Sequence, residues 1–186
     1  MIEIVERRLD ASLNELREAL TPLAPQLLMA AGIMLQAILQ GNRILACGAR
    51  ERSQLAAHFA RLMIGQFEHE RPGLPTMALQ EFPGGREPFA KAIRALGGQG
   101  DVLFAIGRND TEGLQAALEA GREREMQRIL LTCGEEDTLR DALQTRDCLI
   151  CLPPGRAALA HEGQLMVIHA LCDLVDRQLL GLEGAE

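Results

Sequence analysis

Residues 1–40 carry apolar side chains at three- and four-residue steps, a spacing that places them on one face of a helix. Over residues 1–20 this apolar stripe runs beside a face rich in Glu and Arg, and Thr21-Pro22 is expected to break the helix. A second helix is predicted over residues 25–40, where Gly41-Asn42 provides a stop signal. The stripe of the first helix consists of Ile2, Val5, Leu9, Leu13, Leu16 and Leu20.

Beyond these helices, short apolar runs alternate with segments of helical periodicity. Strands are predicted at residues 43–47, 76–79, 101–106, 128–132 and 148–152. Helices are predicted at residues 53–67, 88–96, 112–124, 138–142 and 159–180. Continuous apolar strands that alternate with helices are typical of βαβ units, whose parallel sheet is covered on both faces. The expected fold class is therefore α/β: a three-layer αβα sandwich with a five-stranded parallel sheet, preceded by N-terminal helices.

The leading helices must cover their apolar stripe with something. The stripe can pack on its own domain, or it can join a helix bundle between subunits. We favour the bundle, because two leading helices per chain can assemble four chains. This interpretation divides the chain into N-terminal helices for oligomerisation, residues 1–41, and the α/β domain, residues 42–186.

Composition and charge narrow the class of function. A net charge of −7 and an isoelectric point near 5.2 argue against a general nucleic-acid binder. Aromatic residues make up 3% of the chain, with no Trp or Tyr to stack on bases. No apolar run approaches the ~20 residues that cross a bilayer, and the charged N-terminus lacks the apolar stretch of a secretion signal. We expect a cytoplasmic protein with no direct nucleic-acid binding and no membrane contact.

Five cysteines are present, of which Cys148 and Cys151 form a C-x-x-C that elsewhere serves redox chemistry or zinc binding. Both lie in an apolar run that is predicted to be a strand, where residues three apart face opposite sides. We therefore interpret them as small buried core residues. The odd number of cysteines and the missing secretion signal are typical of reduced thiols.

In open parallel sheets, ligands bind beyond the carboxyl ends of the strands, next to helix N-termini. The two candidate loops are residues 47–54 and 106–112. The chain around them resembles the SIS-domain family and, within it, the phosphoheptose isomerase group, above all those members that associate with the replication initiator DnaA. The resemblance implies a flavodoxin-like sandwich that assembles as a homotetramer. It rests on residues 41–48 (GNRILACG), 57–60 (AHFA), 71–75 (RPGLP) and 168–176 (IHALCDLVD).

The two loops depart from those of the catalytic relatives, whose small and hydroxyl-bearing residues let backbone amides approach a phosphate. Here residues 49–52 read Ala-Arg-Glu-Arg, and residues 107–112 keep a single hydroxyl. The loop arginines either rebuild an anion site, or pair with neighbouring carboxylates such as Glu51 or face water. We favour the second interpretation. The candidate ligand-binding residues are Gly48, Arg50, Arg52, Ser53, Arg108 and Thr111.

The resemblance also implies groups for proton transfer and for a metal. The isomerase group has a glutamate one turn after the histidine that matches His58, where this chain has Leu62, which cannot abstract a proton. His169 matches the isomerase acid and is the residual catalytic candidate. His58, His161 and His169 stand at positions related to a zinc site, and three imidazoles can bind zinc. However, residues eight apart on a helix are separated by about 12 Å of rise, so we expect no cofactor, with zinc as the alternative.

These observations favour a non-catalytic SIS-fold regulator that binds a DnaA-type initiator as a homotetramer. In the initiator-associating relatives an apolar pair near the C-terminus contacts DnaA, and Leu179 and Leu180 stand in that place. The same leucines also fit the last turn of a core helix. Two other functions stay open: a sedoheptulose 7-phosphate isomerase with a degenerate site, and a sensor of a phosphorylated metabolite.

Overall fold

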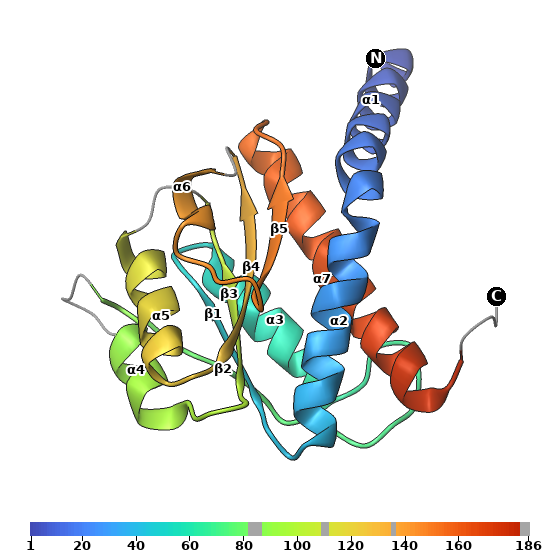
Figure 1. The fold of residues 1–186 in the computed structure, drawn as a ribbon. Coiled ribbons are helices and arrows are strands. Elements are labelled where there is room, and N and C mark those ends of the chain that lie inside the picture. Colours follow the sequence, from blue (N-terminus) through green and yellow to red (C-terminus); the bar gives the residue numbers. More distant parts are fainter. Residues whose placement is uncertain (82–86, 109–111, 135–136, 183–186) are drawn as a thin grey trace.

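The computed structural model describes residues 1–81, 87–108, 112–134 and 137–182. The chain forms a parallel five-stranded sheet with helices on both faces, which confirms the predicted fold class (Figure 1). The spatial order of the strands is β2-β1-β3-β4-β5. The strands are β1 Ile44–Gly48, β2 Thr76–Ala78, β3 Val102–Ile106, β4 Gln127–Cys133 and β5 Cys148–Leu152.

The helices follow the predicted alternation with the strands. Helices α2, α3 and α7 pack on one face of the sheet, whereas α4, α5 and α6 lie on the other face (Figure 1). The helices are α1 Ile2–Leu20, α2 Ala24–Leu39, α3 Arg52–Ile64, α4 Ala90–Leu96, α5 Glu112–Glu123, α6 Asp137–Arg140 and α7 Ala157–Leu180, with a 3₁₀ turn at Thr21–Leu23.

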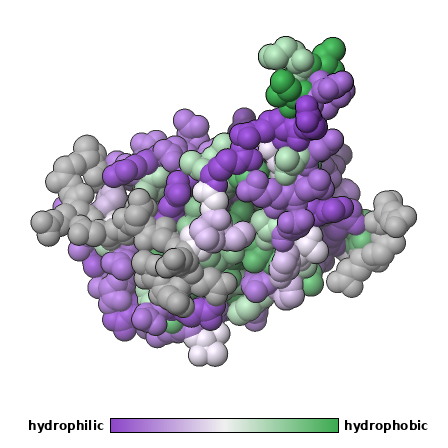
Figure 2. All heavy atoms as spheres, turned by 90° about the horizontal axis from the view of Figure 1, so that it is seen from above, coloured by the Kyte–Doolittle hydropathy of each residue, from purple (hydrophilic) through white to green (hydrophobic). Residues whose placement is uncertain are grey.

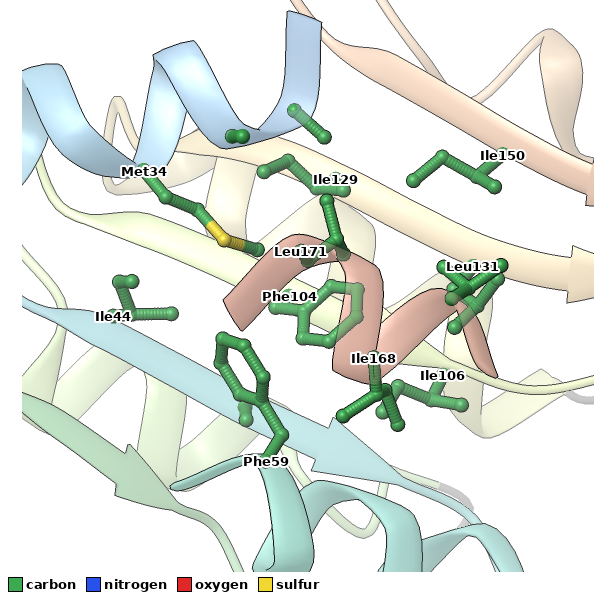
Figure 3. Close-up of a cluster of buried hydrophobic side chains, with 14 of the residues drawn as sticks. Met34, Ile44, Phe59, Phe104, Ile106, Ile129, Leu131, Ile150, Ile168 and Leu171 are labelled. Carbon is green, nitrogen blue, oxygen red and sulfur yellow. The ribbon is translucent and has the colours of Figure 1, made fainter. Parts of the chain in front are cut away.

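The apolar strands serve both faces because successive side chains point to opposite sides. In β1, Ile44 and Ala46 join the core under α2, α3 and α7, whereas Leu45 and Cys47 join the core under α4 and α5. Phe104 of β3 lies at the centre of the first core (Figure 3). This double burial explains why the strands read as continuous apolar runs instead of alternating ones.

The first α-helix ends at Leu20, as predicted, but the interruption at Thr21-Pro22 does not separate the two helices in space (Figure 1). The chain passes from α1 to α2 through a single 3₁₀ turn, and the two helices form one long rod whose N-terminal end projects from the body (Figure 1). Thr21 keeps helical backbone angles and its hydroxyl donates a 2.7 Å hydrogen bond to the carbonyl of Arg17. Pro22 and Pro25 stand in first-turn positions, where proline loses no intrahelical hydrogen bond.

The rod also bears on the expectation that no apolar run is long enough to cross a bilayer. The continuous helix Ile2–Leu39 is long and apolar enough, by length and composition alone, to cross a bilayer. The expectation missed it because Gln and Thr interrupt the apolar run without adding charge. Core helices of folded domains pass the same test, and α2 buries one face against α7 and the sheet. That buried face consists of Ala30, Ala31, Ile33, Met34 and Ala37.

Packing of α2 also bears on the expected division at residue 41. Met34 belongs to the same core as Ile44 and Phe104, so α2 is part of the α/β body. In contrast, α1 buries only Leu16 and packs against α7. The assignment of residues 1–41 to oligomerisation stays a prediction, and it is α1 whose apolar stripe remains in need of a cover.

All five cysteines are buried, and none of them forms a disulfide. Cys148 faces the core under α2 and α7, and burial, with a smaller contribution from Asp147, raises the pKa of its thiol to about 11. Burial raises the pKa of Cys47 to about 12. The thiolate is the reactive form of cysteine, and a raised pKa keeps the thiol of Cys148 protonated. This fits the interpretation of the C-x-x-C as part of the core.

Candidate functional site

The turn between β1 and α3 is held by groups of the chain itself. Gly48 ends β1, and a Cβ atom there would lie 2.3 Å from the carbonyl oxygen of Arg52, so glycine is needed for the close approach of α3. Arg50 has a φ of 55°, in the left-handed region. Its backbone N–H donates a 2.6 Å hydrogen bond to the Glu81 carboxylate. The carboxylate of Glu81 therefore accepts a backbone hydrogen bond in the loop that the sequence suggested for an anionic ligand.

Arg52, the first residue of α3, is buried next to the turn after β1. Its side chain is only 4% exposed, and its guanidinium contacts the carboxylate of Glu51 through Nη1. Its Nε donates to Oε1 of Gln164 at 3.2 Å, and Nε2 of Gln164 donates to the carbonyl of Gly107 at 2.8 Å. Nη2 is buried with no hydrogen-bond partner among the described residues. One chain of hydrogen bonds thus joins the first residue of α3, α7 and the residue that follows β3.

The remaining candidate ligand residues are spread over different environments. Arg50 and Arg108 have exposed side chains, in contrast to buried Arg52. Ser53 is half-buried in the first turn of α3. Thr111 lies outside the described residues. The contact between Arg52 and Glu51 fits the interpretation in which the loop arginines pair with nearby carboxylates, and nothing in the described part joins the three arginines by hydrogen bonds.

A pocket of about 430 Å³ opens beside this turn, between α3 and the end of β2. Ser53 lines it from the helix, and Glu81 lines it from the chain after β2. Because Glu81 also accepts the backbone hydrogen bond of Arg50, the pocket presents a carboxylate next to the serine, which disfavours an anion in it. The lining is Ser53, Gln54, Ala57, Ala78, Leu79, Gln80 and Glu81.

Two of the three predicted histidines meet. His58 of α3 and His169 of α7 approach with their Nε2 atoms 2.9 Å apart. Nη2 of Arg61 lies 2.9 Å from Nδ1 of His58. Phe67 stacks on the His169 ring at a centroid distance of 5.3 Å and an interplanar angle of 28°. The pair therefore connects α3 to α7 on a half-exposed surface.

The residues around this pair do not fit a zinc ion. His161 lies on α7 two turns before His169 and takes no part in the pair. Leu62, one turn after His58, offers no ligand atom. Within the described part of the chain, no three His, Cys, Asp or Glu side chains are grouped closely enough to hold a metal ion. A protein zinc site needs at least three such ligands, so the described residues around the pair supply an incomplete donor set.

The electrostatic surroundings favour neutral His58. Burial lowers the pKa of His58, and His169 and the positive charge of Arg61 lower it further. A histidine with a lower pKa in the native state binds its proton more tightly when the chain is unfolded. Protons therefore favour unfolding, and the stabilising contribution falls as the pH drops through the unfolded pKa of about 6.5.

We expect the stability of the wild type to decrease relative to that of His58→Gln as the pH falls from about 7.5 to about 5. The measurement is urea unfolding of both proteins at each pH. His161→Gln, on α7 but outside the pair, is the control and should track the wild type more closely. A difference between wild type and His58→Gln that does not change with pH would contradict the prediction.

Three residues of this region escaped the sequence analysis. Gln164 has a weak signal in the sequence, because it is a polar residue on the apolar face of a predicted core helix. Arg61 stands three residues after His58, a spacing that brings side chains together on a helix. Glu81 has no local signal, since its partner Arg50 is 31 residues away in the chain.

Comparisons with known proteins place this geometry in context. The sequence profile described as the SIS domain matches residues 9–133. The phosphoheptose isomerase of Thiobacillus denitrificans is 36% identical over 184 residues, which cover 93% of each chain. The DnaA initiator-associating protein DiaA of Cronobacter sakazakii is 38% identical over 161 residues, which cover 81% of this chain and 82% of the relative.

A solved structure gives the same picture. The phosphoheptose isomerase GmhA from Neisseria gonorrhoeae superimposes with a TM-score of 0.84 at 31% identity, and the match covers 94% of this chain and 97% of that chain. The likeness thus extends over nearly the whole fold, including the N-terminal helices. It links the chain both to proteins named as isomerases and to one named for its association with DnaA.

Proposed function

Because the chain belongs to the SIS-domain family, with relatives named as isomerases and as an initiator-associating protein, we propose that it is a non-catalytic SIS-fold regulator. In this proposal it binds a DnaA-type initiator protein and acts as a homotetramer in the cytoplasm. Equivalent binding sites on one assembly raise the effective concentration of bound initiator molecules.

The non-catalytic part of the proposal rests on the turn after β1, where side chains of the protein itself already bond the groups that would bind a phosphate. A phosphate at a helix N-terminus needs free backbone donors and positive charge. Here the N–H of Arg50 is bonded to Glu81, and the Arg52 guanidinium is bonded to Gln164 and contacts Glu51. Leu62 supports the same conclusion, since it stands where the resemblance implies the carboxylate base.

The tetramer is supported by the apolar stripe of α1. Four of its six members, Ile2, Val5, Leu9 and Leu13, are exposed. Figure 2, which views the molecule from above, shows hydrophobic side chains on the projecting end. An amphipathic helix with its apolar face in water gains stability when a second helix covers that face. Size measurement by light scattering should give four times the chain mass, and a monomer at micromolar concentration would contradict this part.

The two C-terminal leucines differ in environment. Leu179 packs against the core, whereas Leu180, the last residue of α7, is 40% exposed. Of the two, only Leu180 presents its side chain to a partner in solution, so Leu180 is the residue of the pair that we assign to the initiator. Loss of a central apolar contact typically costs 1 kcal/mol or more, about a fivefold loss of affinity or greater.

We expect purified DnaA to be retained by immobilised wild-type protein and to bind at least about fivefold more weakly to Leu180→Ala. The matched control is Leu96→Ala. Leu96 is 41% exposed and also ends a helix, α4, on the opposite face of the sheet. Equal binding of DnaA by the wild type and Leu180→Ala would contradict the assignment of Leu180. Failure of the wild type to bind DnaA would contradict the proposed partner.

The second candidate function is a sedoheptulose 7-phosphate isomerase. The close pair of His58 and His169 favours it, since one of these matches the isomerase acid. A coupled isomerase assay tests this alternative, with His169→Ala as the variant. Our proposal predicts no turnover above background in either protein. Turnover by the wild type that is lost in His169→Ala would establish the isomerase instead.

A further inference from the structure

We propose that Arg61 fixes the direction of the hydrogen bond between His58 and His169, and that it thereby keeps the two histidines as a clasp between α3 and α7 and opposes metal binding by them. Arg61 is a positioning residue in this inference, because it acts on His169 through His58. The inference goes beyond the proposed function and does not depend on the partner or on the oligomeric state.

The positions of the ring protons on the two histidines follow from the donors and acceptors in the row Arg61, His58, His169. A guanidinium donates hydrogen bonds and cannot accept them, so Nδ1 of His58 must accept the 2.9 Å bond from Nη2 of Arg61. Neutral His58 then carries its proton on Nε2. Since this Nε2 lies 2.9 Å from Nε2 of His169, His58 donates and His169 accepts. His169 consequently carries its own proton on Nδ1.

With its proton on Nε2, His58 is unsuited to bind a metal through that atom. A histidine that binds a metal through Nε2 needs the lone pair of that atom and carries a proton on Nδ1, which it donates to an acceptor. In this chain Nε2 of His58 holds the proton, and the group at Nδ1 is a donor instead of an acceptor. The guanidinium also repels a dication placed at the pair.

Two neighbouring positions therefore act in the same direction. Leu62, one turn after His58, offers no ligand atom to complete a site, and Arg61 sets a tautomer at His58 that is unsuited to a metal. Phe67 stacks on the His169 ring beside this pair. The pair that results is a hydrogen-bonded contact between two helices that already pack against one another.

The first test reads the tautomers directly by ¹⁵N NMR of histidine-labelled full-length protein at about pH 7.5, above the ordinary histidine pKa. We expect His58 as the Nε2–H form and His169 as the Nδ1–H form. Arg61→Ala should convert His58 to a mixture of tautomers, and Arg61→Lys, which keeps a donor without an acceptor, should restore the wild-type form. His58 as the Nδ1–H form in the wild type, or an unchanged tautomer in Arg61→Ala, would overturn the inference.

The second test uses zinc chloride as the probe, in competition with a chromophoric chelator. Wild type should not compete for zinc, whereas the double variant Arg61→Ala/Leu62→Glu should gain a site that is lost again when His169→Gln is added. The control Arg61→Lys/Leu62→Glu keeps the cation and should bind at least about tenfold more weakly. Zinc binding by the wild type that His169→Gln abolishes, or equal affinity in the two double variants, would contradict the role of Arg61. A double variant that gains no zinc site would also contradict it.

Discussion

Replacement of Asp176 by Asn is expected to lower the free energy of unfolding by about 3–5 kcal/mol, because it leaves a buried guanidinium without its counter-ion. Asp176 of α7 and Arg71 form an ion pair in which both side chains are fully buried. Arg71 also donates to the carbonyl of Met63 at 2.8 Å and to that of Leu62 at 3.2 Å, near the end of α3. The pair thus connects the C-terminal end of α3 to α7, directly beyond the two histidines.

The matched control for this experiment is Asp173→Asn. Asp173 lies on α7 three residues before Asp176, pairs with Arg177 at 2.8 Å, and is 27% exposed. A half-exposed pair of this kind contributes about 0–1 kcal/mol. Urea unfolding at a fixed protein concentration measures both variants, since assembly makes apparent stability depend on concentration. An Asp176→Asn protein as stable as Asp173→Asn would contradict the prediction.

Replacement of Phe104 by Ala is the second large effect that we expect, with a loss of about 3–5 kcal/mol. Phe104 is fully buried in the middle of β3, and its ring meets that of Phe59 edge to face at a centroid distance of 4.8 Å (Figure 3). The alanine variant loses the transfer free energy of the ring and leaves a cavity between the sheet, α3 and α7 that close packing cannot refill.

Two further variants isolate the causes of this loss. Phe104→Leu keeps most of the volume and should cost less than about 1.5 kcal/mol. A double-mutant cycle with Phe59→Leu should give a coupling of about 0.5–1.5 kcal/mol for the ring contact. Urea unfolding measures each variant. A loss of less than about 1 kcal/mol in Phe104→Ala would show that the core collapses into the space, contrary to the prediction.

Local pattern was sufficient for the fold. The strand around Phe104 was predicted at residues 101–106 and is found at Val102–Ile106, because a strand buried on both faces must be apolar throughout. Thr21-Pro22 interrupts the α-helix as predicted but leaves the two helices in line, for an equally local reason (Figure 1). Proline ends a helix where its lack of a backbone N–H costs an intrahelical hydrogen bond. Pro22 stands in the first turn of the 3₁₀ segment, where a residue makes no such bond through its N–H.

The candidate site was predicted only in part. Loop composition indicated that the turn at Arg50 and Arg52 is unsuited to a phosphate, and the structure brings to that turn two groups from far along the chain, Glu81 and Gln164. Among the histidines, sequence analysis indicated His169 as the residual catalytic candidate and His58, His161 and His169 together as the alternative of a zinc site. The packing of α3 against α7 selects His58 and His169 and leaves His161 outside the pair.

The sequence by itself determined the layered α/β architecture and the position of the candidate loops, because both depend on periodicities and residue types within a few turns or strands. The family followed from a resemblance that extends over nearly the whole chain. Only the tertiary structure decided that the Glu81 carboxylate accepts the backbone hydrogen bond of Arg50, that Arg52 is buried against Gln164 and that His58 meets His169. These contacts join segments whose meeting depends on how helices dock on the sheet. Their energies are set by burial, which no local pattern specifies.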